Sequence, residues 1–272
     1  MIFYEDAQEF FGRCLDELSG DIDKMNISRK DNLISSCYKH EILETYTCNQ
    51  CGQVSSLTSS DVSIWCDVYK SSQEDLDLQQ LLLNNFSNEI REKRCHNCNF
   101  NEATLKTKIT ILPPILVIYL KRFRYGLHNN GKVRNCVKFP SLVELSTVVD
   151  AEVKLPNTNS REFNSGNHSY LLQSVVSHKG STETSGHYIA DVRRSDAGKT
   201  PVWFRYDDDT VTKTNLESVL TGGNVLDGYI FTYLYKGRIP KEILIRELFD
   251  FWVWTFIIQS FFFKLNHFLS NS

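Results

Sequence analysis

Residues 185–209 read SGHYIADVRRSDAGKTPVWFRYDDD, and the rest of the chain is organised around them. An apolar alternation follows His187, and a second strand-like run, rich in aromatic residues, ends at Tyr206. The segment Arg193–Pro201 between them holds serine, aspartate, glycine and proline, which favour turns. The pattern predicts an antiparallel hairpin whose two open ends lie together, so we expect His187 to lie near Asp207.

A histidine beside a carboxylate has a defined chemistry. The carboxylate fixes the tautomer of the ring and stabilises its cation, and the other ring nitrogen is then free to activate a nucleophile. His187 and Asp207 therefore predict two of the three members of a catalytic triad. The alternative for a lone Gly186-His187-Tyr188 is a partly exposed strand histidine with no catalytic role.

The composition bounds the class of protein. The chain has 272 residues, of which 41% are hydrophobic and 23% charged, as is ordinary for a globular protein with a sizeable core. Its formal net charge of -3 argues against a nucleic-acid binder, including a zinc-ribbon one, because such proteins usually carry a basic excess. The N-terminus shows no signal-peptide pattern. We therefore expect a reducing compartment, the cytoplasm and/or the nucleus.

Four of the eight cysteines form two C-x-x-C pairs, Cys48/Cys51 and Cys95/Cys98. Two sulfurs at this spacing fit a knuckle that presents both to one tetrahedral zinc ion, and Gly52 suits the tight turn after the first pair. Two knuckles predict a closed, structural four-thiolate site. The alternatives are coincidental spacing and a redox pair of the thioredoxin type.

Other segments predict a mixed set of elements. Asp6–Leu18 has the periodicity of an amphipathic helix, and Ile115–Leu120 that of a strand buried on both faces. We expect Lys121-Arg122-Phe123 to be a solvated edge, and Asp150–Asn167 and the segment from His178 to be loops. Further strands are expected within Cys37–Tyr46, Val62–Val68, Lys106–Ile111, Val133–Phe139, Tyr170–Ser177 and Gly228–Leu234, and a helix within Leu76–Phe86.

The segment 248–263 reads LFDFWVWTFIIQSFFF and is mostly apolar. It is shorter than the ~20 residues that a spanning helix usually needs, and Asp250 lies near one end. Three interpretations remain open: a tail anchor, an amphipathic helix packed on the domain, and the product of an aberrant gene end. Membrane contact is the less favoured one.

Several blocks stand in the order that one protein family shows, over roughly residues 4–235. They are Glu5–Phe10, the two C-x-x-C pairs, Leu112–Phe123, Tyr170–Gly180, Gly186-His187-Tyr188 and Trp203–Asp208. Together they resemble the ubiquitin-specific proteases, which are papain-like cysteine deubiquitinases (ubiquitin carboxyl-terminal hydrolases). The resemblance implies an α+β, papain-like cysteine protease fold shaped like a right hand. It has a helical thumb, an antiparallel β palm and zinc-binding β fingers at roughly residues 41–112. The domain would span 1–236 and the apolar tail 237–272.

The resemblance also implies roles for single residues. His187 would be the general base, Asp207 its orienting carboxylate, and Asp208 the second acidic or amide position that polarises the site. Asp6 is similar to the acidic residue that holds the basic C-terminal tail of ubiquitin. The implied cofactor is one structural zinc on Cys48, Cys51, Cys95 and Cys98, with no catalytic cofactor. The implied partners are ubiquitin and ubiquitinated proteins, not nucleic acid.

The chain departs from the family in one decisive respect. The nucleophilic cysteine, preceded by an asparagine, belongs well before the Glu5–Phe10 block, and only five residues precede Asp6. We therefore expect a catalytic domain truncated at its N-terminus, inactive by itself, whose thumb residues Phe10, Phe11, Leu15 and Leu18 lack part of their cover. Two functions stay open: a deubiquitinase by family, and a non-catalytic module that binds ubiquitin or another protein.

Overall fold

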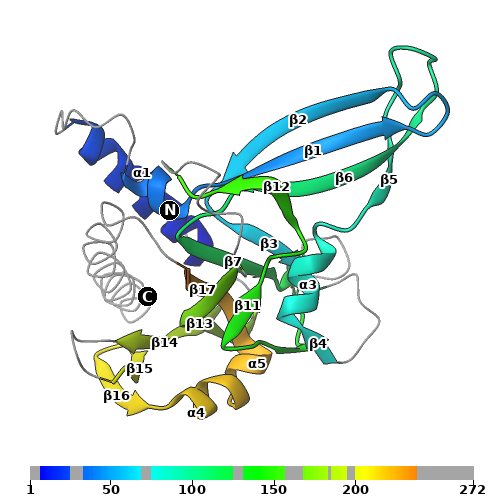
Figure 1. Cartoon of the computed structure of the whole chain (residues 1–272). Helices are drawn as coiled ribbons and strands as arrows, with labels where there is room; N and C mark the ends of the chain where they lie inside the picture. The colour runs from blue at the N-terminus through cyan, green and yellow to red at the C-terminus, as the bar shows by residue number, and fades with distance from the viewer. Residues whose placement is uncertain are drawn as a thin grey trace, which may run out of the picture.

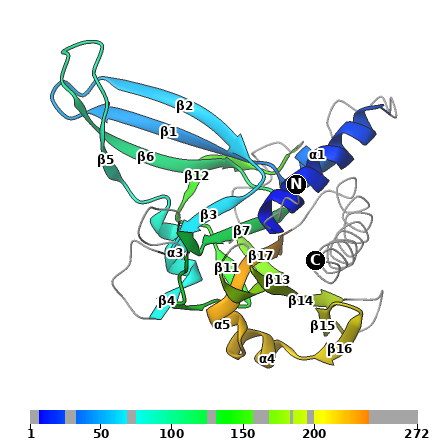
Figure 2. The same ribbon diagram turned by 180° about the vertical axis from the view of Figure 1, so that it is seen from behind.

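The computed structural model describes residues 7–24, 33–68, 75–124, 131–156, 168–182, 185–194 and 200–237. Two β-sheets dominate it, with short helices around them (Figure 1). We call the eight-stranded sheet the palm sheet and the five-stranded sheet the finger sheet. In both views the finger sheet projects away from the palm sheet (Figures 1 and 2). This arrangement confirms the predicted α+β fold and its hand-like shape.

The palm sheet is mostly antiparallel and carries the predicted hairpin near one edge. Its order is β16 (Thr210–Thr214), β15 (Val202–Asp207), β14 (Ser185–Arg194), β13 (Ser169–Thr182), β17 (Gly228–Tyr235), β7 (Ile115–Lys121) and β3 (Ile64–Asp67), and β11 (Leu142–Glu144) pairs with β13.

The finger sheet consists of more exposed strands, and its β2 and β5 are exposed along their whole length. Its order is β12 (Val149–Lys154), β6 (Glu102–Ile111), β1 (His40–Cys48) and β2 (Val54–Asp61), and β5 (Glu89–Glu92) pairs with β6. The smaller elements are α1 (Ala7–Lys24), α2 (Leu33–Tyr38), α3 (Leu78–Asn84), α4 (Leu216–Thr221), α5 (Asn224–Asp227) and the pairs β4 (Asp75–Asp77) with β10 (Cys136–Lys138) and β8 (Phe123–Arg124) with β9 (Gly131–Lys132).

Strand β7 divides the core in two, because its alternate side chains enter opposite hydrophobic clusters. Val117 and Tyr119 face the cluster that contains α1 and α2, whereas Ile118 and Leu120 face the cluster that contains α3. All residues from Ile115 to Leu120 are buried, so the predicted doubly buried strand is confirmed.

The face of α1 that was expected to lack cover is covered. Phe11 is 5% exposed and Leu15 is 3% exposed, and Phe10 is half-buried against the same cluster. The Phe11 ring packs edge-on against Tyr38 of α2 and Tyr119 of β7, with ring centroids 6.1 and 6.3 Å apart. The expectation of an uncovered thumb helix is therefore wrong for Phe11 and Leu15, whereas the half-buried Phe10 agrees with it in part. The side chain of Leu18 lies outside the described residues. The helix also runs to Lys24, beyond the end of its apolar stripe.

Arg122 was expected at a solvated edge and is instead fully buried. Its guanidinium donates from Nε to Gly228 O (2.7 Å), from Nη1 to Val133 O (3.1 Å) and Asn135 O (3.0 Å), and from Nη2 to Val225 O (3.3 Å). Burial lowers the pKa of Arg122 to about 10. The Arg122 side chain therefore connects four separate backbone positions, those of Val133, Asn135, Val225 and Gly228. The sequence pattern did not indicate this role.

Three expected loops or strands also differ from the structure. Residues 150–154 of the expected loop Asp150–Asn167 belong to β12 (Val149–Lys154), which pairs in parallel with β6 and buries Val153, while residues 157–167 lie outside the described part of the chain. The segment from His178 continues as strand to Thr182, because it pairs with the start of β14. Cys37 lies in helix α2, not in a strand. For β12 the pairing with a distant strand overrides the local pattern, and for His178–Thr182 the pairing with the following strand does so.

Candidate functional site

The hairpin of β14 and β15 brings together the histidine and the carboxylates singled out in the sequence. Its register pairs Ala190 with Tyr206, so the open end of the hairpin holds His187 and the residues after Tyr206. His187 Nε2 lies 2.5 Å from Asp207 Oδ1, and His187 Nδ1 lies 4.0 Å from Asp208 Oδ1. The side chains are 33%, 44% and 50% exposed, so the group is open to solvent. The predicted juxtaposition is confirmed.

The backbone around this group is constrained on both sides. Asp208 has a φ of +52°, in the left-handed region, at the turn between β15 and β16. On the other side, a Cβ at Gly186 would lie 2.2 Å from Nε2 of His178 and 2.8 Å from Lys179 O. Only glycine fits before His187, because the ring of His178 fills the space that a side chain needs.

His178 is a buried histidine beside the site whose importance the sequence did not reveal. It is 1% exposed and packs between the rings of Phe123 and Tyr188, with centroids 5.2 and 4.7 Å away. Its backbone carbonyl accepts a hydrogen bond from the buried ammonium of Lys132. Burial lowers the pKa of His178 to about 4, and the charge of Lys132 acts in the same direction.

This low pKa predicts a loss of stability in mild acid. A histidine in an unfolded chain has a pKa of ~6.5. Below that pH the unfolded chain binds a proton at His178, whereas the folded chain leaves His178 neutral until the pH approaches 4. The free energy of unfolding should therefore fall as pH drops from about 6.5 towards 4, by up to about 3 kcal/mol for His178. His40 is 5% exposed with a pKa of about 4, also lowered by burial, and adds to the fall.

Chemical denaturation across this pH range measures the effect. His178→Phe should show a shallower pH dependence than the parent chain, and His40→Phe should do so independently. An unchanged slope in either variant would mean that its histidine does not resist protonation in the folded state.

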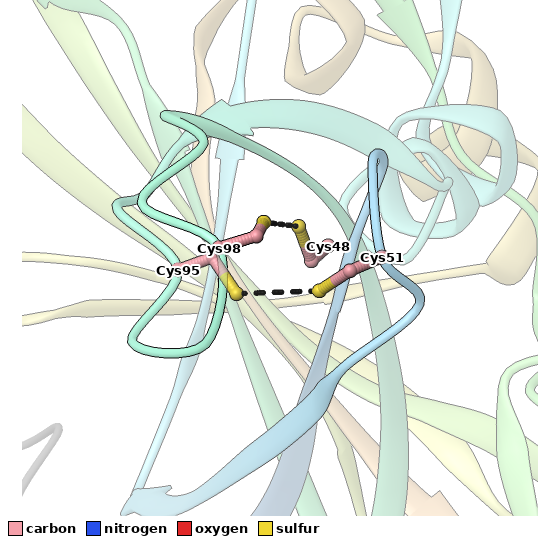
Figure 3. A group of neighbouring side chains, drawn as sticks. All are labelled: Cys48, Cys51, Cys95 and Cys98. Atoms are coloured by element: carbon pink, nitrogen blue, oxygen red, sulfur yellow. Dashed lines mark hydrogen bonds between the residues drawn. The ribbon is translucent and has the colours of Figure 1, made fainter.

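The four cysteines of the two C-x-x-C pairs converge in the finger sheet. Cys48 and Cys51 come from the turn between β1 and β2, and Cys95 and Cys98 from the loop between β5 and β6 (Figure 3). The Sγ atoms of Cys48 and Cys98, and those of Cys51 and Cys95, are each 3.6 Å apart. All four sulfurs lie within 4.8 Å of one another. The expectation of two facing knuckles is confirmed.

The two knuckles share one backbone geometry. Gly52 N donates to Cys48 O (3.0 Å) with a φ of +70°, and Asn99 N donates to Cys95 O (2.9 Å) with a φ of +61°. Asn99 therefore takes the left-handed position that Gly52 takes in the first knuckle, as asparagine tolerates. Sequence reasoning identified the glycine and missed the asparagine.

The donor set fits a tetrahedral metal ion. A zinc ion with Zn–S bonds of ~2.3 Å needs sulfurs about 3.8 Å apart, close to the observed separations. The amide of Cys51 lowers the pKa of Cys48, and hydrogen bonds from the Gln53 amide and the Asn97 side chain lower the pKa of Cys51 to about 6. Both effects favour the thiolate, which is the form that binds metal. Zinc bound there would hold the two loops together and supply no catalytic chemistry.

Two sequence expectations lie outside the described residues. They are the ubiquitin-tail role of Asp6 and the interpretation of the apolar segment 248–263. Among the residues that are described, no helix is long and apolar enough to span a membrane.

Comparison with known proteins agrees with this geometry. The family model described as ubiquitin carboxyl-terminal hydrolase matches residues 3–233. Ubiquitin carboxyl-terminal hydrolase 13 of Saccharomyces cerevisiae is 25% identical over 267 residues, covering 88% of this chain and 33% of the yeast protein. Ubiquitin carboxyl-terminal hydrolase 9 of the same yeast is 26% identical over 250 residues, covering 84% of this chain and 31% of the yeast protein.

A solved structure shares the fold. In the SAGA Ubp8/Sgf11/Sus1/Sgf73 DUB module bound to ubiquitin aldehyde, one chain superposes with a TM-score of 0.67 at 21% identity. The match covers 86% of this chain and 50% of that one. The chain spans about a third of the length of the two yeast relatives. The family match extends over most of the chain, which therefore belongs to the ubiquitin carboxyl-terminal hydrolase family.

Proposed function

We propose that this chain carries the acid–base half of a thiol-dependent deubiquitinase site, with the nucleophile absent from it. The observation that carries the proposal is the contact between His187 Nε2 and Asp207 Oδ1 at 2.5 Å. This contact leaves Nδ1 of the same ring as the atom that can exchange a proton with a thiol. Asp208, 4.0 Å from Nδ1, is proposed to polarise the site.

In a site completed by a cysteine, His187 Nδ1 would take the thiol proton while the sulfur attacks the carbonyl carbon after the last glycine of ubiquitin. The tetrahedral oxyanion then collapses, the C–N bond breaks, and the proton passes from Nδ1 to the departing lysine amine. Water next attacks the thioester and gives one proton to His187; the C–S bond then breaks, His187 returns that proton to the sulfur, and the ubiquitin carboxylic acid loses its own proton to solvent as it leaves. Asp207 orients the ring and stabilises its cation throughout.

We propose that no cysteine of the chain takes the place of that nucleophile. All eight cysteines lie in the described residues, and the close group of His187, Asp207 and Asp208 contains no cysteine sulfur. Four sulfurs form the finger cluster, and Cys66 is fully buried with its pKa raised by burial to about 12. A buried thiol of this kind is a poor nucleophile. We therefore propose that the chain alone does not turn over.

A second candidate function is a ubiquitin-binding module without catalysis. Two observations favour it. Both the finger sheet and the palm sheet are formed in the described part of the chain. The same fold occurs in a DUB module whose solved structure is bound to ubiquitin aldehyde. We propose ubiquitin and ubiquitinated proteins as partners, with Asp6 as a contact for the basic ubiquitin tail. We also propose residues 1–236 as the catalytic-type domain, and the cytoplasm and/or nucleus as the location of the protein.

Two assays on the purified chain separate these functions. We expect no hydrolysis of a fluorogenic amide of the ubiquitin C-terminus, because His187 has no thiol to activate. We expect calorimetric titration with ubiquitin to show binding, with a mutant of the ubiquitin tail as the control. Hydrolysis that is lost in His187→Ala would contradict the missing nucleophile. Failure of both hydrolysis and binding would contradict both functions.

A further inference from the structure

A buried carboxylate lies on the same hairpin as the proposed site. Asp191 of β14 is 1% exposed and lies opposite Arg205 of β15. Its Oδ1 accepts from Arg205 Nε at 2.9 Å, and its Oδ2 accepts from Arg205 Nη2 at 2.7 Å and from Asn224 Nδ2 at 2.7 Å. This two-pronged pairing with arginine is directional, so it defines the relative position of the two strands.

Asn224 extends this network to three further elements, α4, α5 and β13. It is 1% exposed at the start of α5, and its Nδ2 also donates to Val219 O at 3.1 Å, which uses both of its amide hydrogens. Its Oδ1 accepts from Ser177 Oγ of β13 at 2.9 Å. One chain of hydrogen bonds therefore joins β13, α4, α5, β14 and β15, with Asp191 at its centre.

The network lies on the same face of the hairpin as the proposed catalytic pair. Successive side chains of a strand alternate between faces, so His187 and Asp191 share a face of β14, and Arg205 and Asp207 share a face of β15. A slip of one residue would turn Arg205 and Asp207 to the opposite face together. It would leave the carboxylate of Asp191 buried without its cation, which is strongly unfavourable.

The pair at the open end cannot set this register by itself. His187 and Asp207 are 33% and 44% exposed, and an ion pair between exposed groups contributes little to stability. Asp191 is deeply buried and bonded on both oxygens, so it discriminates between registers far better.

We infer that Asp191, Arg205 and Asn224 are positioning residues, which hold β15 in the register that places Asp207 against His187. The inference rests on the proposed function only in assuming that the His187–Asp207 pair matters. Its test measures the geometry of that pair and needs no turnover. The positioning role can therefore fail while the proposed function stands, and the proposed function can fail while the positioning role stands.

NMR of the isotope-labelled chain provides the test. Nuclear Overhauser effects (NOEs) between the His187 ring protons and the Cβ protons of Asp207 should be present in the parent chain. They should disappear in Arg205→Leu and persist, weakened, in Arg205→Lys, which keeps a cation for Asp191. A role in stability alone would lower the melting temperature and leave these NOEs intact in the folded molecules.

Two further variants keep the test decisive if Arg205→Leu does not fold. The double variant Asp191→Leu/Arg205→Leu buries no charge and should fold, because apolar replacement of a buried pair is tolerated, yet it should lose the NOEs. Arg193→Leu, on the same face of β14, is the matched control, since its guanidinium lies 3.5 Å from Gln173 Oε1 and bonds no buried carboxylate among the described residues. A folded double variant with full NOEs would overturn the inference.

Discussion

Replacing Cys51 by serine should abolish the metal binding that we propose for the four cysteines, and it should unfold the finger sheet while the palm sheet stays folded. The four sulfurs link the turn between β1 and β2 to the loop between β5 and β6. Structural zinc contributes about 10–16 kcal/mol to the folding of zinc-finger peptides at neutral pH. The strand β2 is exposed along its whole length, so few apolar contacts remain to hold it once the metal is lost.

Elemental analysis and hydrogen exchange measure this effect. The parent chain should bind one equivalent of zinc, and Cys51→Ser should bind markedly less. Exchange should quicken in β1, β2, β5 and β6 and stay slow in β7, β13 and β17. Cys136→Ser is the matched control, because Cys136 lies outside the cluster. Full zinc content and unchanged protection in Cys51→Ser would contradict the assignment of the four cysteines to a metal.

Replacing Arg122 by methionine should destabilise the palm by about 3–5 kcal/mol, because each buried carbonyl that is left without a donor costs about 1–3 kcal/mol. The guanidinium donates to four backbone carbonyls, those of Gly228, Val133, Asn135 and Val225. Methionine fills much of the space and leaves all four carbonyls without that donor, at a cost for each buried group. A loss of this size is a large part of the ~5–15 kcal/mol that stabilises an ordinary domain.

Denaturant unfolding followed by tryptophan fluorescence can measure this loss. Arg122→Lys should recover only part of the stability, because an ammonium lacks the fork that reaches carbonyls on both sides. The exposed neighbour Lys121, replaced by glutamine, is the control and should change stability little. If Arg122→Met unfolds at the same denaturant concentration as the parent chain, these hydrogen bonds contribute no net stability.

The sequence predicts local features of this protein well. Periodicity identified the buried strand β7, the amphipathic helix α1 and the hairpin that joins His187 to Asp207, because each depends on neighbours in the chain. The spacing of the cysteines predicted the two C-x-x-C knuckles, because the two cysteines of each knuckle are also close together in the chain. Family resemblance then assigned chemistry to residues that periodicity alone leaves ambiguous.

Features that depend on distant contacts were missed. Arg122 is polar and follows a buried strand, so its pattern indicates a solvated end, whereas carbonyls from elsewhere in the fold surround it. The strand β12 pairs with β6 through a segment whose composition favours a loop. The network of Asp191, Arg205 and Asn224 joins elements that are 14 and 33 positions apart along the chain. No local pattern encodes such contacts.

We propose above all that the chain holds the histidine and carboxylates of a deubiquitinase site and no cysteine that can act with them. The most direct test of this claim is reaction with ubiquitin that carries a thiol-reactive electrophile at its C-terminus, followed by intact mass spectrometry. We predict no adduct of ubiquitin on any of the eight cysteines under conditions in which a catalytically competent family member is labelled fully. An adduct whose formation requires His187 would contradict the claim, and peptide mapping would then identify the nucleophile.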